Sequence, residues 1–81
     1  MLITGMSQTL TPARFIREHV FGLKTQDEFA RLLGYQQATI SRFETGQPLS
    51  TKAQERIRRL ARCRQVKWDN NWFFEVPKRV A

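Results

Sequence analysis

One stretch of the chain constrains the fold more than any other: residues 25–46, TQDEFARLLGYQQATISRFETG. Two short segments with apolar residues at helical spacing flank Gly34, so the chain must turn sharply between two helices. Such helices cross closely when one contributes a small side chain and the other a β-branched side chain. Ala30 and Ile40 supply these two side chains. The spacing is typical of a helix-turn-helix unit.

The first two helices have clear start and stop signals. Thr11 followed by Pro12 predicts the beginning of one helix, and Gly22 predicts its end. A Thr-x-x-Glu capping box and the glycine that follows predict a second helix over residues 26–33. The apolar edge predicted for this second helix consists of Phe29, Leu32 and Leu33.

Two more helices are predicted farther along the chain. The third runs from near Gln36 to Glu44, and its start is weak because glutamine is a poor N-cap. Ser50 caps the fourth helix, residues 51–63. Among the charged residues, Glu44 is the best candidate for a structural ion pair, with Arg17 as its partner.

The segment after the fourth helix is aromatic. Trp68, Trp72, Phe73 and Phe74 fall within seven residues, and Asp-Asn-Asn between them is turn chemistry. We therefore expect a β-hairpin or one short strand, with Phe73 facing away from the helices. We interpret this segment as the dimerisation element; the alternative is a flap that completes the monomer core, and both roles can hold together. The residues predicted to dimerise are Trp68, Trp72, Phe73, Phe74 and Val76.

The chain length and these elements together predict one small domain. The expected fold class is all-α: a four-helix helix-turn-helix domain over residues 11–64 with a short C-terminal β extension. A flexible N-terminal arm, residues 1–10, precedes the domain, and the aromatic extension, residues 65–81, follows it.

The charge balance indicates an anionic partner. Fourteen Lys and Arg against seven Asp and Glu leave a net charge of +7, which favours nucleic acid first and a membrane surface second. The lone Cys63 excludes an intramolecular disulfide and fits a reducing cytoplasm. Neither a membrane span nor a signal peptide is expected. The sequence has no paired carboxylates and no ligands at metal-binding spacing, so we expect no enzyme, metal or cofactor.

The sequence of residues 25–46 resembles the DNA-binding core of the lambdoid phage repressor and Cro family, the Xre-type helix-turn-helix regulators. The Thr-Gln that opens the second helix, the Ile-Ser-Arg of the third and the Glu-x-Gly that ends it carry the likeness, which covers roughly residues 11–61. Lys24 is an extra residue relative to the family, and the linker TGQPLS is short. The resemblance implies a lambda-repressor-like fold and a homodimeric regulator whose third helix enters the major groove of double-stranded DNA.

The outer side of the third helix carries the candidate base-reading residues. Ile40 and Phe43 define its inner side on a helical wheel, so polar residues point outward. Arg42 can donate two hydrogen bonds to guanine, and Gln37 can pair with adenine. The residues predicted to read bases are Gln36, Gln37, Ala38, Ser41 and Arg42.

A second set of residues is expected to touch the DNA backbone. Gln26 begins the second helix, where unpaired N–H groups favour a phosphate, and the resemblance implies a backbone contact for it. Thr25 next to it has the alternative role of a pure helix cap. The residues predicted to contact the backbone are Thr25, Gln26, Thr39, Thr45, Gln47 and Lys52.

These features predict a cytoplasmic, sequence-specific transcription regulator of the Cro or mobile-element repressor type, bound as a homodimer to a pseudo-palindromic operator. One alternative is an antitoxin that binds a toxin through its C-terminal segment and autoregulates its operon. A general nucleic-acid packing protein is a third possibility, although it would not need tuned base-facing side chains.

Overall fold

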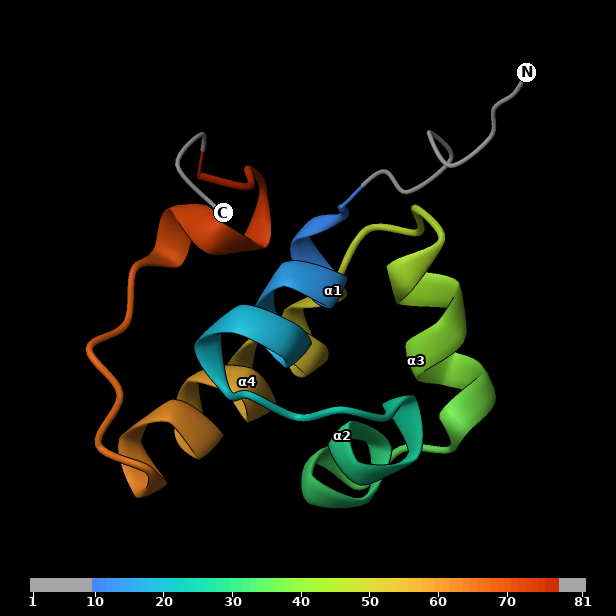
Figure 1. Cartoon of the computed structure of the whole chain (residues 1–81), viewed down its shortest axis with the longest axis horizontal. Coiled ribbons are helices and arrows are strands. Elements are labelled where there is room, and N and C mark those ends of the chain that lie inside the picture. Colours follow the sequence, from blue (N-terminus) through green and yellow to red (C-terminus); the bar gives the residue numbers. More distant parts are fainter. Residues whose placement is uncertain (1–9, 78–81) are drawn as a thin grey trace.

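A computed structural model describes residues 10–77 of the chain. Figure 1 shows the helices packed around one centre, with α3 at one end of the molecule and the C-terminal segment at the opposite end. In chain order, the elements are α1 (Pro12–Phe15), the π-helical turn η2 (Ile16–Val20), α2 (Gln26–Leu33), α3 (Gln37–Glu44), α4 (Thr51–Cys63) and the 3₁₀ turn η3 (Asn70–Phe73).

The first predicted helix is present but changes form along its length. The Thr11 hydroxyl accepts a hydrogen bond from the Arg14 N–H at 3.3 Å, which caps α1 as predicted. The helix then widens into η2, where the Phe21 N–H donates to the Ile16 carbonyl five residues earlier. The segment ends at Gly22, whose φ is 66°.

The helix-turn-helix follows the predicted boundaries. Thr25 accepts from the Glu28 N–H at 3.2 Å and caps α2. The helix ends at Gly34, which adopts φ 78°, a left-handed conformation that glycine reaches without strain. The Tyr35 N–H then donates to the Ala30 carbonyl at 2.8 Å and closes the turn. As expected, α3 begins after Gln36, whose side chain makes no capping hydrogen bond.

The core confirms most of the predicted inner positions. Phe29, Ala30 and Ile40 are each 1% exposed, so α2 and α3 cross at the small side chain. Leu32 was predicted to face the core, and this prediction is wrong, because Leu32 is 43% exposed. Burial of Ala30 turns the helix so that Leu32 lies roughly 100° from the centre of the buried arc. Leu10, the first described residue, packs against the core; the rest of the predicted arm lies outside the described residues.

The predicted C-terminal strand is wrong. Residues 10–77 contain no strand, and the aromatic segment forms the 3₁₀ turn η3. Asp69 accepts a hydrogen bond from the Asn71 N–H at 2.9 Å, so the predicted turn residues start a helical turn in place of a hairpin.

The facing of the aromatic residues also differs from the prediction. Phe73 was expected to face away from the helices, and this prediction is wrong, because Phe73 is 5% exposed, whereas its neighbour Phe74 is 71% exposed. A 3₁₀ turn repeats every three residues, so the alternation of a strand does not apply. Trp68 stacks on Phe21 with ring centroids 6.3 Å apart, and Trp72 meets Phe15 at 5.7 Å. The segment is a flap that completes the monomer core.

Candidate nucleic-acid interface

Helix α3 carries a polar outer side at one end of the molecule (Figure 1). Ile40 and Phe43 hold its inner side in the core. Of the predicted base-reading residues, four are exposed and Ser41 is half-buried. The four exposed residues are Gln36, Gln37, Ala38 and Arg42.

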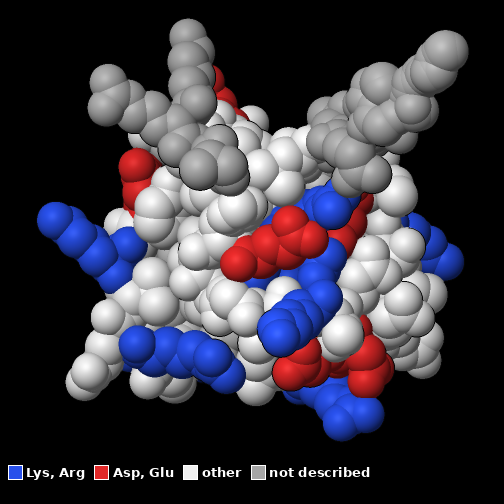
Figure 2. Space-filling view, in the orientation of Figure 1, with Lys and Arg blue, Asp and Glu red and all other residues white. Residues whose placement is uncertain are grey.

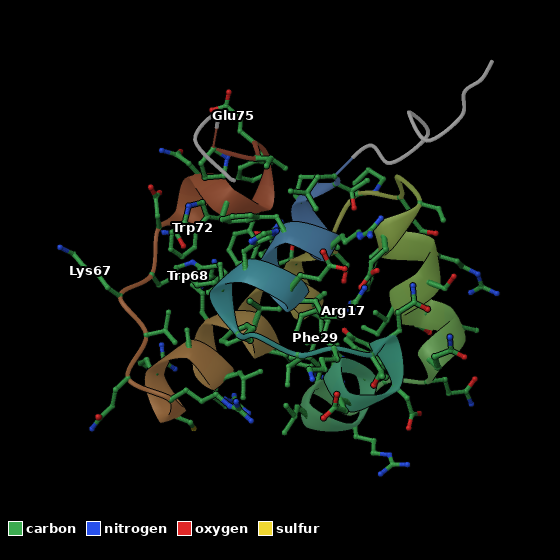
Figure 3. All side chains as sticks on the ribbon, in the orientation of Figure 1. Arg17, Phe29, Lys67, Trp68, Trp72 and Glu75 are labelled. Carbon is green, nitrogen blue, oxygen red and sulfur yellow. The ribbon has the colours of Figure 1, made fainter. Side chains whose placement is uncertain are left out.

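A buried ion pair fixes the end of α3. The Arg17 Nε lies 2.6 Å from Glu44 Oε2, and its Nη2 lies 3.1 Å from Oε1, so the contact is bidentate. The two side chains are 7% and 4% exposed. The hydrogen bond to Glu44 raises the pKa of Arg17, against the desolvation that lowers it. The predicted pair is therefore confirmed, and Figure 3 shows Arg17 between the first helical segment and α3.

The same arginine ties down the loop before α2. Its Nη1 donates to the carbonyl oxygens of Leu23 at 3.2 Å and Lys24 at 2.8 Å. Arg17 thus connects η2, the loop and α3.

A chain of hydrogen bonds runs from this ion pair to the surface of α3. Gln26 Nε2 donates to Glu44 Oε1 at 3.1 Å, and Gln37 Nε2 donates to Gln26 Oε1 at 2.8 Å. A carboxylate only accepts hydrogen bonds, so Glu44 sets which way the Gln26 amide points, and Gln26 in turn sets Gln37. We call the four residues Arg17, Glu44, Gln26 and Gln37 the reading network.

The hydrogen bonds of the reading network leave specific donor and acceptor atoms available on the exposed Gln37 side chain. An amide nitrogen carries two hydrogens and the amide oxygen two lone pairs. After donating to Gln26, Gln37 keeps one N–H and its Oε1 for a ligand. The ion pair and both glutamines were predicted from the sequence, but not the single chain of hydrogen bonds that they form. The available signal was the placement of a glutamine at the start of both α2 and α3.

The Helix-turn-helix family model matches residues 23–68, more than half of the chain. The chain belongs to this family of Xre and Cro type. Searches of curated proteins and of solved structures give no match. The family consists of DNA-binding transcription regulators, and the chain is a DNA-binding regulator by this membership. Within residues 10–77, no helix is long and apolar enough to cross a membrane, and no group of metal-ligating side chains gathers.

The predicted backbone-contacting residues of this helix-turn-helix protein differ in how much of each side chain is available. Gln47 and Lys52 are exposed. The Thr25 hydroxyl donates to Glu28 Oε1 at 3.2 Å, and the Thr45 hydroxyl donates to the Ser41 carbonyl at 3.1 Å. A phosphate contact from either threonine therefore requires its hydroxyl to rotate. Two of the predicted set are half-buried, namely Gln26 and Thr39.

Charges of both signs share the face drawn in Figure 2. Acidic and basic side chains are intermingled over α2 and the first helical segment. One exposed pair there is Asp27 with Arg31, whose atoms lie 2.9 Å apart. Basic side chains stand without acidic neighbours at the lower left of the view, beside the end of α4. The positive charge of this helix-turn-helix protein is therefore not confined to the surface around α3.

Proposed function

We propose that the chain is a sequence-specific transcriptional repressor of the Cro or mobile-element type that reads the DNA major groove with α3. It acts in the cytoplasm as a homodimer on a pseudo-palindromic operator and blocks polymerase by occupying that site. The observation that carries the proposal is the reading network, which holds exposed Gln37 from behind with two hydrogen bonds in series. A side chain that only contacts solvent does not need hydrogen bonds that fix its orientation.

The side chains on α3 suit base edges. Gln37 retains one donor and one acceptor, which match adenine N7 and N6. Arg42 is exposed and can donate twice to guanine O6 and N7. Ala38 and the methyl group of Thr39 can contact a thymine methyl group. Each bidentate contact contributes about 1–3 kcal/mol of discrimination against the wrong base.

The backbone contacts complete the site in this proposal. Gln26 keeps one amide N–H after its bond to Glu44 and offers it to a phosphate beside the start of α2. Gln47 and Lys52 flank α3 on the other side, together with Thr25 and Thr45 once their hydroxyls rotate. Binding should weaken steeply with salt, because each phosphate contact releases counterions.

The direct test is selection of bound sites from random DNA. We expect a palindrome whose half-sites are about one helical turn, roughly 34 Å, apart. Arg42→Ala should relax the preference at one position per half-site and cost about 1–3 kcal/mol on the selected site. Arg31→Ala is the matched control, because Arg31 is exposed on α2 and paired with Asp27. Equal affinity of the native chain for selected and scrambled DNA would contradict the proposal.

A second candidate function is that of an antitoxin, and exposed Phe74 favours it. Phe74 directly follows η3, and η3 lies at the end of the molecule opposite α3 (Figure 1), where a protein partner could bind without covering the DNA-reading side. In this function the C-terminal segment masks a toxin, and DNA binding autoregulates the pair. A small toxin-like reading frame next to the gene, or a protein that co-purifies through Phe74, would support it. A Phe74→Ser variant that retains the partner would argue against it.

A further inference from the structure

The arginines of α4 lie on a part of the molecule that the proposed DNA contacts do not use. Basic side chains stand without acidic neighbours beside the end of this helix (Figure 2). None of its arginines belongs to the residues proposed to read bases or to contact the DNA backbone. Their positive charge is therefore available for a second, anionic partner. The arginines of α4 are Arg56, Arg58, Arg59 and Arg62.

An open hollow of about 470 Å³ lies between the C-terminal halves of α2 and α4, and we call it the basic groove. Three arginines line it, no acidic residue does, and Leu32 and Leu60 add apolar surface. Charges of one sign in a concave surface with apolar walls strengthen the local field. The basic groove therefore attracts an anionic group and offers it an apolar contact. The arginines of the basic groove are Arg31, Arg56 and Arg59.

These three arginines differ in the partners that they already have. Arg56 is held in place, since its Nη1 donates to the Leu33 carbonyl at 3.0 Å and its guanidinium lies 4.7 Å from the centre of the Tyr35 ring. Arg31 forms an exposed salt bridge within α2. Arg59 is exposed and forms no salt bridge within residues 10–77. The uncompensated charge of the basic groove is therefore centred on Arg59.

The exposure of Leu32 indicates which kind of anionic partner fits. Leu32 is 43% exposed and Leu60 is half-buried, so a fitting partner has an apolar group to cover them. The phosphates of a nucleic-acid backbone supply no such group, and the flat surface of a bilayer does not enter a hollow. An amphipathic helix supplies it, because apolar and acidic side chains three or four residues apart lie side by side.

We infer that the basic groove binds an acidic amphipathic helix of a partner protein. One large apolar side chain of this helix lies between Leu32 and Leu60, and a carboxylate one turn away meets Arg59. The α4 side of the basic groove runs from Arg56 to Cys63. This distance is about 10 Å along the helix axis, so the basic groove fits about two turns of the partner helix.

Binding in the basic groove leaves the DNA-reading side open. None of the residues proposed to read bases or to contact the DNA backbone lines the basic groove. Figure 1 shows the end of α4 on the side of the molecule away from α3. One chain can therefore hold DNA and the partner helix together. The inference goes beyond the proposed function, and its tests contain no operator, so either can fail without the other.

Selection from displayed random peptides of about 16 residues, roughly four helical turns, is the first test. The native chain should enrich peptides that carry acidic residues three or four positions from a large apolar residue. Measured by fluorescence anisotropy, Arg59→Glu should weaken binding of a selected peptide by at least about tenfold and Leu32→Ser by about fivefold. Lys67→Glu is the matched control, because Lys67 is exposed and lies outside the groove lining. It should change the affinity by less than about twofold.

An exchange of charges then tests whether the peptide meets Arg59 itself. Replacing the critical acidic residue of the peptide by arginine should abolish binding to the native chain. Binding to the Arg59→Glu variant should recover, because the contact again joins opposite charges. Arg59 and Leu32 are exposed, so thermal unfolding of both variants should match that of the native chain. Enrichment of peptides without acidic residues, or an exchange that restores no binding, would overturn the inference.

The single cysteine reports whether the basic groove is occupied. Cys63 is exposed and lines the groove. The selected peptide should slow alkylation of Cys63 by a maleimide at least about tenfold in the native chain, but not in Arg59→Glu at the same peptide concentration. Random-sequence duplex DNA and phosphatidylserine vesicles should not protect Cys63 to this extent. Equal protection by either probe, or alkylation that slows as the chain itself is concentrated, would replace the partner helix by nucleic acid, a membrane or a second copy.

Discussion

The two ends of the molecule are stabilised by different kinds of interaction. At the α3 end, Arg17, Glu44, Gln26 and Gln37 are joined by directional hydrogen bonds that fix each polar atom. At the flap end, aromatic rings meet at varied angles, from 16° between Phe21 and Trp68 upward. Hydrogen bonds fix the orientation of a polar group, as a base-reading side chain requires. Ring packing supplies buried area with looser orientation, which is sufficient to close a core.

The largest expected effect comes from breaking the ion pair at the α3 end. Arg17→Met should lower the free energy of unfolding by about 3–5 kcal/mol, because it leaves the buried Glu44 carboxylate without its positively charged partner. Urea denaturation measures the loss. Adding Glu44→Leu should recover most of it but not base discrimination, because Gln26 then has no carboxylate to orient it. If the double variant regains full specificity, the reading network does not hold Gln37.

A substitution in the aromatic flap tests how strongly ring packing stabilises the other end of the molecule. Phe73→Ala should cost about 3 kcal/mol of unfolding free energy, near the low end for a buried phenylalanine, because η3 lies at one edge of the core. Phe74→Ala is the matched control and should change monomer stability by less than about 0.5 kcal/mol, since Phe74 is exposed. Thermal unfolding of both variants measures the two losses of stability. Equal losses would mean that the assignment of inner and outer rings is wrong.

A double-mutant cycle on DNA sharpens the comparison. Gln26→Ala and Gln37→Ala should each weaken binding to the selected site, and their effects should deviate from additivity by about 0.5–3 kcal/mol because the side chains touch. Gln26→Ala should also weaken binding across sequences through its phosphate contact. Gln47→Ala paired with Gln37→Ala should be additive. Additivity of the glutamine pair would argue against a network that positions Gln37.

The smallest effect concerns the start of α3. Gln36 occupies the N-cap with extended backbone angles but makes no capping hydrogen bond. Gln36→Ser should therefore raise the free energy of unfolding by about 0.5–1 kcal/mol, while Gln36→Ala should not. If Gln36 also reads a base, the serine variant will bind the operator less tightly despite its higher stability. Chemical denaturation and a binding titration on the same samples separate the two roles.

The helices could be predicted from the sequence because their ends are encoded locally. Thr25, Gly34 and Ser50 act on residues within one helical turn, and the structure places α2 and α4 at the predicted bounds. The outward side of α3 followed from helical period alone. The Arg17–Glu44 pair was also predictable, since a charged residue at an inner helical position needs a partner.

The conformation of the aromatic flap could not be predicted in the same way, because it depends on residues that lie far away in the sequence. The Asp-Asn-Asn sequence is compatible with either a hairpin or a 3₁₀ turn. The preference of aromatic residues for strands depends on how they pack, so it does not decide between the two. Rings from the first helical segment, Phe15 and Phe21, receive Trp72 and Trp68 and decide the outcome. The prediction that Leu32 faces the core was wrong for a related reason, because the rotation of α2 about its axis is set by where Ala30 crosses α3.

The buried ion pair has a consequence for how heat would act on regulation. Arg17 joins η2, the loop before α2 and the end of α3, so the exposed Gln37 side chain is oriented only while all three remain docked. A domain of this size has a small margin of stability. Core substitutions far from the DNA are therefore expected to behave as heat-sensitive alleles, which release the operator at temperatures that the native protein tolerates. Gene expression measured against temperature would then report on the packing of the core.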